Sequence, residues 1–593
     1  MEILKKNLNE EQLPIASDLT GNVLVIAGPG SGKTRLIVHR IGYELRQSPN
    51  EQYKILCLTF TNEAAKALRE RLAPNIPSNA KNRIRIGNFH QFGQSLLSSY
   101  GHLIGINRDF EVIDEDDAAD IVERVLDTLS IRNVKARDLY HVISKARGHV
   151  HQPNQDELMG TSGRFNDILK LYARTKLESN VVDFDDLIEL PTVLLRRNEH
   201  VKAIIRDVYR SIYVDELQDT SLSQLDLLKE IYCPASSKIF GVADEDQIVY
   251  EWRDARLATI TEFKDDFGAD VKFLVLNHRS PQEIVEVANT LISNNNERYQ
   301  KELKSAVDDR HGFVFLHVAS NPAKEAEFIA NYILNDVSTK GVAFGQVAIL
   351  ARVGFALKPI KRALSKYEIP LVYVGDPEVR SSPITRLLKA AYSCAAGRPD
   401  GSGRLKATCH NINETIGDVE VDPDLAVQVA TTMRNARPYD FLKKFLSTLK
   451  LSETLAGSPL EEQLSIAVKV VNQAILSGAR NVSELSRMLV LEWNHLESVA
   501  LSGEDCVKLM SIHQAKGLEF PVVFIPRVEE QMFPYVRKNS PVNEEEERRL
   551  MFVAITRAKS EVVMSLCQLD DFGRRRLPSP FIDEISECKI EGI

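Results

Sequence analysis

The stretch VLVIAGPGSGKT, which begins at Val23, limits what this chain can fold into more than any other. Its first five residues are a short apolar run of the kind that forms a buried strand, and GPGSG ends it. Beyond Lys33, apolar residues recur at every fourth position (Ile37, Ile41 and Leu45), which predicts one buried face of a helix. A strand, a glycine loop and a helix in this order open an α/β nucleotide-binding unit.

The glycine-rich turn itself predicts a phosphate-binding loop. Its glycines let backbone N–H groups surround the phosphates at a helix N-terminus, Lys33 would reach the β- and γ-phosphates of ATP, and the Thr34 hydroxyl would bind Mg²⁺. Ala27 stands where the strict pattern has glycine. A chance glycine-rich turn is the alternative, which the flanking strand and helix disfavour. The candidate ATP-binding residues are Ala27, Gly28, Pro29, Gly30, Ser31, Gly32, Lys33, Thr34 and Arg35.

Three further strand-like runs each end in polar residues. Ile55–Leu58 leads into TFTN, Ile212–Val214 into DELQDT, and Ile239–Val242 into ADEDQ. Open parallel sheets bind ligands at the carboxyl ends of their strands. We therefore expect Asp215 to hold the magnesium ion and Glu216 to orient the attacking water. By itself, an acidic pair after a strand is weak evidence for a catalytic site. Its occurrence in a chain that also has a phosphate loop makes the evidence stronger.

The rest of the chain alternates between helical and strand-rich blocks. Residues 95–200 carry a helical pattern, and a second helical block follows the turn-rich GRPDGSG at 397–403. Strand signals flank the second block at Phe273–Leu276, Val347–Leu350, Leu371–Val374, Lys508–Ile512 and Val522–Ile525. The predicted fold class is α/β, with two parallel-sheet cores that are each interrupted by a mainly helical insert. The basic residues within 135–149 predict a solvated helix face, with a DNA contact as the alternative.

Composition excludes several classes of protein. The chain has 593 residues, 44% of them hydrophobic and 26% charged, which is typical of about four globular units. It shows neither an apolar run that would span a bilayer nor the apolar segment of a signal peptide. The seven cysteines form no CxxC pair, which argues against a zinc site or a disulfide framework and predicts a cytoplasmic protein. A net charge of −9 disfavours a non-specific DNA-coating protein but allows a local DNA groove.

The segment ADEDQIVYEWRD combines five carboxylates with Tyr250, Trp252 and Arg253, a composition unusual for a core strand or a surface loop. Together with TFTN, DELQDT and SIHQAKGLEF, it resembles the motifs of the UvrD/Rep (PcrA-like) family of superfamily 1 DNA helicases. Further matches in the family's order are LNEEQ, GNFH, NHRS, EEERRLMFVAITRA and PSPFIDEI. The resemblance therefore runs almost from end to end.

This resemblance implies two RecA-like core domains with ATP between them and one insert in each. The implied ranges are 1–92 with 199–271 for the first core domain, 93–198 for its insert, 272–379 with 501–593 for the second core domain, and 380–500 for a reduced second insert. The second insert shows no match to the glycine motif with which relatives grip duplex DNA. Because the sequence stops soon after PSPFIDEI, the family's long partner-binding tail and the appended nuclease domain of recombination enzymes are not expected.

The resemblance also assigns roles around the nucleotide. The implied contacts are Gln12 with the adenine, Glu519 with the ribose, and Gln247, Arg279 and Arg557 with the γ-phosphate. An arginine that neutralises the transferring phosphoryl group raises the rate by roughly 10³–10⁵. His278 replaces the tyrosine that stacks on adenine in most members, so we expect nucleotide affinity and base preference to differ.

On the DNA side, Tyr250 and Trp252 would be a stacking platform for unpaired bases, which is worth roughly 1–3 kcal/mol per base, and Arg253 would end it. Asp244 and the neighbouring carboxylates would belong to the ATP end of this segment, and Glu251 replaces a glycine near the DNA path. The implied channel lining is Phe60 and His90, with Thr59, Asn62 and His513 as polar contacts. For Phe60, packing in the core is an almost equally good interpretation.

The implied activity is an ATP-dependent DNA helicase that moves 3′ to 5′ on single strands and unwinds duplex in repair, recombination or defence. Two alternatives stay open: a single-strand translocase that separates duplex poorly, which the reduced second insert favours, and the motor subunit of a nuclease complex. The expected partners are single-stranded and partial-duplex DNA and a nuclease or repair protein, with no membrane. The chain itself is expected to be a monomer or to self-associate weakly.

Overall fold

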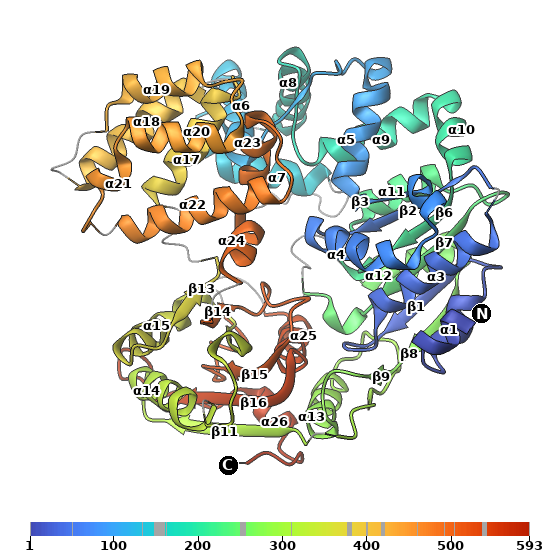
Figure 1. Cartoon of the computed structure of the whole chain (residues 1–593), viewed down its shortest axis with the longest axis vertical. Coiled ribbons are helices and arrows are strands. Elements are labelled where there is room, and N and C mark those ends of the chain that lie inside the picture. Colours follow the sequence, from blue (N-terminus) through green and yellow to red (C-terminus); the bar gives the residue numbers. More distant parts are fainter. Residues whose placement is uncertain are drawn as a thin grey trace. The chain divides into compact units, whose positions relative to one another are not determined.

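In the computed structural model, the described residues are 2–49, 51–132, 134–147, 161, 163–249, 257–309, 311–337, 339–375, 382–398, 401–416, 421–458, 460–491, 493–502, 505–536 and 542–591. The chain forms two compact units (Figure 1). Unit 1 comprises Met1–Phe315, Pro534–Val562 and Ser579–Ile593, and unit 2 comprises Leu316–Phe533 and Val563–Pro578. None of the described helices combines the length and apolar character that a membrane crossing needs.

Unit 1 is built on a six-stranded sheet in which every neighbouring pair is parallel. In spatial order its strands are β3 (Ile84–Asn88), β2 (Lys54–Thr59), β6 (Tyr209–Val214), β7 (Lys238–Ala243), β1 (Val23–Ala27) and β8 (Asp270–Leu274). Successive strand residues face opposite sides of a sheet, and here helices cover both sides. Leu24 and Ile26 of β1 join one core cluster, whereas Val23, Val25 and Ala27 join the other. This double burial explains why the run beginning at Val23 is apolar throughout.

Most helices of unit 1 either cover one of the two faces of this sheet or form the first insert. One face packs against α2 (Gln12–Ser17), α3 (Lys33–Gln47) and α4 (Asn62–Leu72), together with α1 (Glu2–Asn7). The other face packs against α5 (Phe89–Tyr100), α9 (Asp186–Arg197), α10 (Glu199–Val208), α11 (Leu222–Ile231) and α12 (Leu257–Phe267). The insert has a separate core formed by α6 (Glu115–Thr128), α7 (Ala136–Arg147) and α8 (Phe165–Glu178), beside the short strand pair β4 (Glu111–Val112) and β5 (Val181–Val182). Unit 1 also contains β9 (Leu276–Asn277), β10 (Lys304–Ser305), α13 (Gln282–Ile292), α25 (Glu544–Ile555) and α26 (Pro580–Glu584).

A second six-stranded sheet forms the base of unit 2, and two of its strands, β11 and β16, begin in unit 1. Its spatial order is β11 (Phe313–Ala319), β16 (Ala558–Cys567), β15 (Phe520–Ile525), β12 (Val347–Ala351), β14 (Val507–Ser511) and β13 (Leu371–Tyr373). The pairs β15–β12, β12–β14 and β14–β13 are parallel, and α14 (Pro322–Tyr332) and α15 (Leu357–Lys366) accompany them. The predicted α/β class with two parallel-sheet cores is confirmed.

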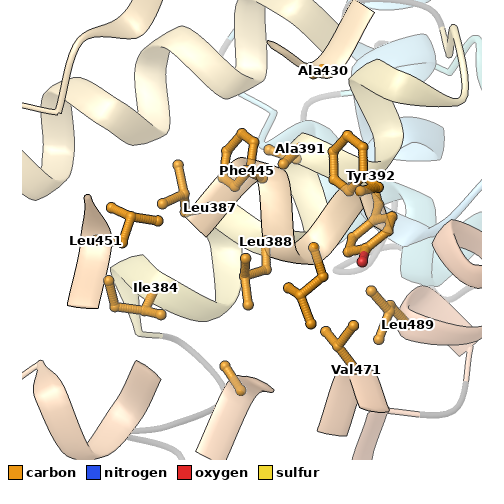
Figure 2. Packing of buried hydrophobic residues seen from close by; sticks show 14 of the residues in the cluster. Ile384, Leu387, Leu388, Ala391, Tyr392, Ala430, Phe445, Leu451, Val471 and Leu489 are labelled. Carbon is orange, nitrogen blue, oxygen red and sulfur yellow. The ribbon is translucent and has the colours of Figure 1, made fainter. Parts of the chain in front are cut away.

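The second insert is a bundle with its own hydrophobic core. Its helices are α17 (Pro383–Ala395), α18 (Gly401–Ile416), α19 (Pro423–Thr432), α20 (Pro438–Thr448), α21 (Leu451–Thr454), α22 (Glu461–Leu476), α23 (Val482–Leu491) and α24 (Trp493–Ser502). Figure 2 shows Leu387, Leu388 and Tyr392 of α17 among side chains from the surrounding helices. The Tyr392 hydroxyl donates a hydrogen bond of 3.0 Å to the carbonyl of Pro438, which satisfies the one polar atom of this buried ring.

Candidate ATP site and DNA-contact residues

The phosphate loop lies between β1 and α3, as its sequence predicts, and two of its glycines have left-handed backbone conformations. Gly30 has φ +71° and Gly32 has φ +81°. A Cβ atom would lie 2.8 Å from Oδ1 of Asn277 at the first position and 2.6 Å from Nε2 of Gln12 at the second. Both conformation and space therefore require glycine. The loop ends at the N-terminus of α3, where N–H groups without intrahelical partners can bind an anion.

The carbonyl oxygens of the loop are all engaged by the protein. The Asn277 Nδ2 atom donates to the Pro29 carbonyl at 2.9 Å, and its Oδ1 atom accepts the N–H groups of Arg279 and Ser280, each at 2.8 Å. Asn277 thereby hydrogen-bonds the NHRS segment to the phosphate loop. The remaining contacts are His278 N–H to Gly30 at 3.0 Å, Gln12 Nε2 to Ser31 at 2.8 Å, Ser31 Oγ to Gly28 at 2.7 Å, and Leu36 N–H to Gly32 at 2.9 Å.

Asp215 and Glu216 follow β6 directly. Asp215 is buried, and burial together with the charge of Glu216 raises the pKa of Asp215 to about 7, although Lys33 acts to lower it. Glu216 has φ +52°, and one of its carboxylate oxygens accepts a hydrogen bond from Nε2 of Gln218. Oε1 of Gln218 in turn accepts the N–H of Asp244 at 3.0 Å. A buried carboxylate that resists ionisation beside a second carboxylate favours a divalent cation as partner, so Asp215 and Thr34 fit the magnesium ion expected from the sequence.

Asp244 connects the phosphate-loop lysine to a buried ionic cluster. Its Oδ2 atom lies 3.6 Å from Nζ of Lys33 and accepts a hydrogen bond of 2.7 Å from Nε2 of Gln247. Its Oδ1 atom lies 3.2 Å from Nζ of the fully buried Lys301. Burial acts to raise the pKa of Asp244, but Lys301 and Lys33 outweigh that effect and hold it below its usual value. Asp244 is therefore ionised beside the site where the phosphates are expected.

The two carboxylates after Asp244 face the cluster. Lys301 Nζ lies 2.6 Å from Glu245 and 2.8 Å from Asp246, and Arg298 binds both carboxylate oxygens of Asp246 at 3.0 and 2.8 Å. Both carboxylates are buried. The ion pairs of Glu245 and Asp246 with these cations stabilise the loop that carries Gln247.

The two arginines of the predicted site also lie in unit 1. The buried Arg557 donates from Nη2 to Oε1 of Gln247 at 3.4 Å and from Nε to the Val553 carbonyl at 3.0 Å. Arg279 donates from Nη1 to the Thr556 carbonyl at 2.9 Å. All six residues of the predicted catalytic set therefore lie in unit 1: Lys33, Asp215, Glu216, Gln247, Arg279 and Arg557.

The other predicted nucleotide-binding residues lie on the phosphate loop's neighbours, on α3 and in unit 2. The Gln12 amide, which the resemblance assigns to the adenine, is buried against Ser31 of the loop, while the His278 side chain is exposed with Nε2 at 2.9 Å from Nδ2 of Asn9. Thr34 is half-buried and Arg35 exposed on α3. Glu519 belongs to unit 2, where it is exposed just before β15.

Several DNA candidates lie at the carboxyl edge of the first sheet. β2 and β3 are neighbours, with Thr59 paired to Asn88, so the segments carrying Phe60 and His90 lie side by side. The His90 ring meets the Phe184 ring edge to face with centroids 5.9 Å apart, and both side chains are half-buried. The sequence analysis did not single out Phe184, although an aromatic residue among the aspartates of VVDFDDL is a signal that the sequence contains.

The other DNA candidates vary in how far the structure describes them. Tyr250, Trp252 and Arg253 lie outside the described residues. Asn62 begins α4, and His513 is half-buried in the turn after β14 in unit 2. Thr59 is buried, and its hydroxyl donates to the Thr61 carbonyl at 2.8 Å. Arg147 of the predicted basic face is bound by the carboxylates of Asp183, Asp186 and Glu189, so it belongs to a structural ion cluster.

Comparison with known proteins matches most of the chain to one family. The UvrD/REP helicase N-terminal domain matches residues 8–268, and the UvrD-like helicase C-terminal domain matches residues 273–379 and 444–569. The ATP-dependent DNA helicase Rep of Buchnera aphidicola subsp. Baizongia pistaciae is 29% identical, with 98% of this chain and 95% of that protein covered. The ATP-dependent DNA helicase PcrA of Leuconostoc citreum is also 29% identical, covering 100% and 86%. The chain therefore belongs to the UvrD/Rep family of ATP-dependent DNA helicases.

Proposed function

We propose that this protein hydrolyses ATP at the phosphate loop and uses the energy to move 3′ to 5′ along single-stranded DNA and to separate duplex DNA. The observation that carries the proposal is the chain of contacts from Lys33 through Asp244 and Gln247 to Arg557. This chain of contacts supports a site that a phosphate-binding cation, Lys33, shares with a second buried cation, Arg557. That is the charge arrangement that phosphoryl transfer needs.

Each residue near the phosphates has a proposed role. Lys33 and the N-terminus of α3 bind the phosphates, and Thr34 with Asp215 would hold Mg²⁺, which neutralises phosphate charge when bound. Glu216 accepts the proton of the water that attacks the γ-phosphorus, while ADP leaves with the β–γ bridging oxygen. Arg557 and Arg279 stabilise the negative charge on the transferring group. Gln247 reports the state of the γ-phosphate to the DNA-contacting segment that follows it.

The DNA contacts and the four-part division are proposals of the same kind. Phe60, His90 and the Tyr250–Arg253 segment would form the single-strand channel. For His513, a polar contact with DNA stays a separate proposal. The two sheets and the two separate helical cores described above support a division into two core domains and two inserts. All seven cysteines are thiols outside any disulfide, which supports the proposed cytoplasmic location. We also propose a monomeric or weakly self-associating motor that has a nuclease or repair protein as partner.

A specific observation favours the alternative of a translocase that needs a partner to unwind. Within its span from 273 to 569, the C-terminal family domain leaves residues 380–443 unmatched. These residues include α18 and α19 and contribute to the core in Figure 2. About half of the predicted second insert thus lies outside the matched family domain, which supports a duplex-contacting surface of its own.

One preparation of the full chain tests these functions. ATP hydrolysis is measured with and without single-stranded DNA, with Lys33→Ala as the control, and strand separation is measured on duplexes with a 3′ or a 5′ tail. A helicase shows DNA-stimulated hydrolysis and unwinds only from the 3′ tail. A translocase shows the same stimulation and displaces streptavidin from a biotinylated strand without separating duplex. Hydrolysis that is absent, or unchanged by Lys33→Ala, would refute the proposed function.

A further inference from the structure

The segment between α13 and β10, residues 295–303, has no regular secondary structure, yet three of its polar side chains are buried. Asn295 and Lys301 are buried residues, and the Arg298 side chain is 6% exposed. Connecting segments usually run over the surface, because polar groups that leave water need partners inside the protein. The partners of these three side chains therefore indicate what the segment does. Residues 295–303 are called the brace below.

The first residue of the brace binds α25, the helix that leads to Arg557. Oδ1 of Asn295 accepts a hydrogen bond of 2.6 Å from Nη1 of Arg548, and Nδ2 of Asn295 donates to the Glu545 carbonyl at 3.1 Å. Nε and Nη2 of Arg548 bind the two carboxylate oxygens of Glu584, each at 2.7 Å. Because Arg557 is hydrogen-bonded to the last turn of α25, a shift of this helix would carry the guanidinium with it.

The next two polar residues of the brace bind the loop that carries Gln247. Nε and Nη2 of Arg298 lie 3.0 and 2.8 Å from the two carboxylate oxygens of Asp246. Nζ of Lys301 lies 3.2 Å from Oδ1 of Asp244. Two parallel N–H···O bonds fix the direction of a carboxylate as well as its distance. Since Gln247 directly follows Asp246, the brace determines where its amide lies.

The last residue of the brace packs against the phosphate loop. A Cβ atom on Gly28 would lie 2.2 Å from Cδ2 of Leu303, so the leucine side chain fills the space beside this glycine. The Leu303 N–H donates to Oδ1 of Asn289 at 3.1 Å, and Nδ2 of Asn289 donates to the Leu303 carbonyl at 2.9 Å. These two bonds anchor the end of the brace on α13. One short segment thus contacts α25, the Gln247 loop and the phosphate loop in turn.

We propose that the brace sets the distance between Gln247 and Arg557, and that Asn295 and Arg298 are positioning residues for ATP hydrolysis. The proposal rests on the proposed ATP site. The Gln247 oxygen and Nη2 of Arg557 are 3.4 Å apart and belong to residues 310 positions apart, so their geometry depends on what holds the two elements that carry them. The brace is bound to both. A misplacement of about 1 Å near a reacting group can cost roughly 10² in rate.

Arg298→Lys in the full chain tests the proposal by steady-state ATP hydrolysis. Lysine keeps the charge that Asp246 needs but lacks the fork of donors, so kcat should fall roughly tenfold to a hundredfold with little change in KM. In the Arg557→Ala background the same substitution should lower kcat no further, because the guanidinium that the brace positions is absent. A fall of equal size in both backgrounds, a rise in KM alone, or unchanged kinetics would overturn the proposal.

Arg527→Lys is the matched control for the loss of a buried arginine. Arg527 is a buried residue of unit 2 whose Nε and Nη2 each lie 2.8 Å from Oε1 of Glu529. Its replacement should lower the melting temperature, as Arg298→Lys does, but leave kcat at the wild-type value. An equal loss of kcat in Arg527→Lys would show that destabilisation alone slows hydrolysis, and the proposal would be wrong.

Asn295→Asp tests the other end of the brace and takes the place of Arg298→Lys if that variant does not fold. Aspartate keeps an oxygen for Arg548 but loses the donor to the Glu545 carbonyl. It should lower kcat with little change in KM, and only where Arg557 is present. A loss of kcat that is independent of Arg557 would overturn the proposal. A wild type whose hydrolysis is absent or independent of Lys33 would instead overturn the proposed function.

Discussion

Nη2 of Arg557 lies 3.4 Å from Oε1 of Gln247, a residue 310 positions earlier in the chain. The other end of the same amide donates to Asp244, which faces Lys33. The Gln247 amide thus lies between a carboxylate and a buried guanidinium. Its NH₂ group donates to Asp244, and its oxygen accepts from Arg557. A change in the charge near Lys33 can reach Arg557 through a single side chain.

Arg557→Ala should preserve ATP binding and reduce kcat by roughly 10³ or more, because the lost charge matters most once the γ-phosphoryl group begins to leave. Arg557→Lys, which keeps the charge but loses the fork of donors, should recover only part of that rate. Single-turnover hydrolysis and equilibrium binding of ATP separate the two effects. A large loss of affinity with little loss of rate would make Arg557 a ground-state ligand only.

Lys33→Ala and Glu216→Gln should both lose ATP hydrolysis, but only Lys33→Ala should also weaken ATP binding. Lys33→Ala should abolish hydrolysis and weaken ATP binding, since it removes the cation that faces the phosphates and Asp244. Glu216→Gln should bind ATP and Mg²⁺ but turn over very slowly, because the water loses its base while Asp215 can still hold the metal. Both variants should retain single-strand binding, measured by fluorescence anisotropy. If Glu216→Gln instead lost metal-dependent ATP binding, the roles of the two carboxylates would be reversed.

Gly32→Ala should lower both ATP affinity and melting temperature. An alanine in this left-handed conformation costs about 1–2 kcal/mol, and its Cβ atom would also push the Gln12 amide from its place against Ser31. Gly21→Ala is the matched control, since a Cβ atom there would have no neighbour within 4 Å. The comparison requires only thermal melting and ATP titration. Equal behaviour of the two variants would contradict the requirement for glycine at position 32.

The raised pKa of Asp215 predicts a pH-dependent effect on stability. Because burial and Glu216 raise the pKa of Asp215 from its usual value of 3.8 to about 7, the native state prefers the protonated form. This group therefore favours folding at low pH and ceases to do so as pH rises through 7. Asp215→Asn removes the ionisable group, and in metal-free protein it should raise the melting temperature more at pH 8 than at pH 5. Asp183→Asn should do the reverse, destabilising the fold at pH 8, because Arg147 and Lys176 overcome burial and hold the pKa of Asp183 below its usual value. Similar shifts for both variants would exclude this account.

Trp252→Ala tests the proposed stacking platform. Hydrolysis without DNA should stay close to wild type, while single-strand affinity should fall by roughly 1–3 kcal/mol. Unwinding at saturating DNA should fall further, because each hydrolysis event would be poorly coupled to a base step. Melting temperature is the control: a buried tryptophan would cost about 3–5 kcal/mol of stability on truncation. An early-melting variant that loses both activities together would show that Trp252 is a core residue.

The parts of the site that the sequence predicts are those encoded within a few residues. The phosphate loop depends on glycines at fixed spacing, and Asp215 directly follows a strand, so their positions could be inferred locally. The partners of Glu245 and Asp246 could not, because Lys301 and Arg298 come more than 50 positions later. We expected those carboxylates to belong to the ATP end of their segment, and the structure adds that buried cations bind both of them. The basic residue Arg147 was misleading for the same reason, since its acidic partners lie 36 to 42 positions away.

The engagement of every carbonyl from Gly28 to Gly32 has a kinetic consequence. A loop whose oxygens are already bound has few other shapes to adopt, so the entropy of ordering it is lost during folding and not when ATP arrives. A phosphate then meets a surface of hydrogen-bond donors that is already in place. Association should therefore be governed by the encounter of the two molecules, with no slow rearrangement of the loop after contact.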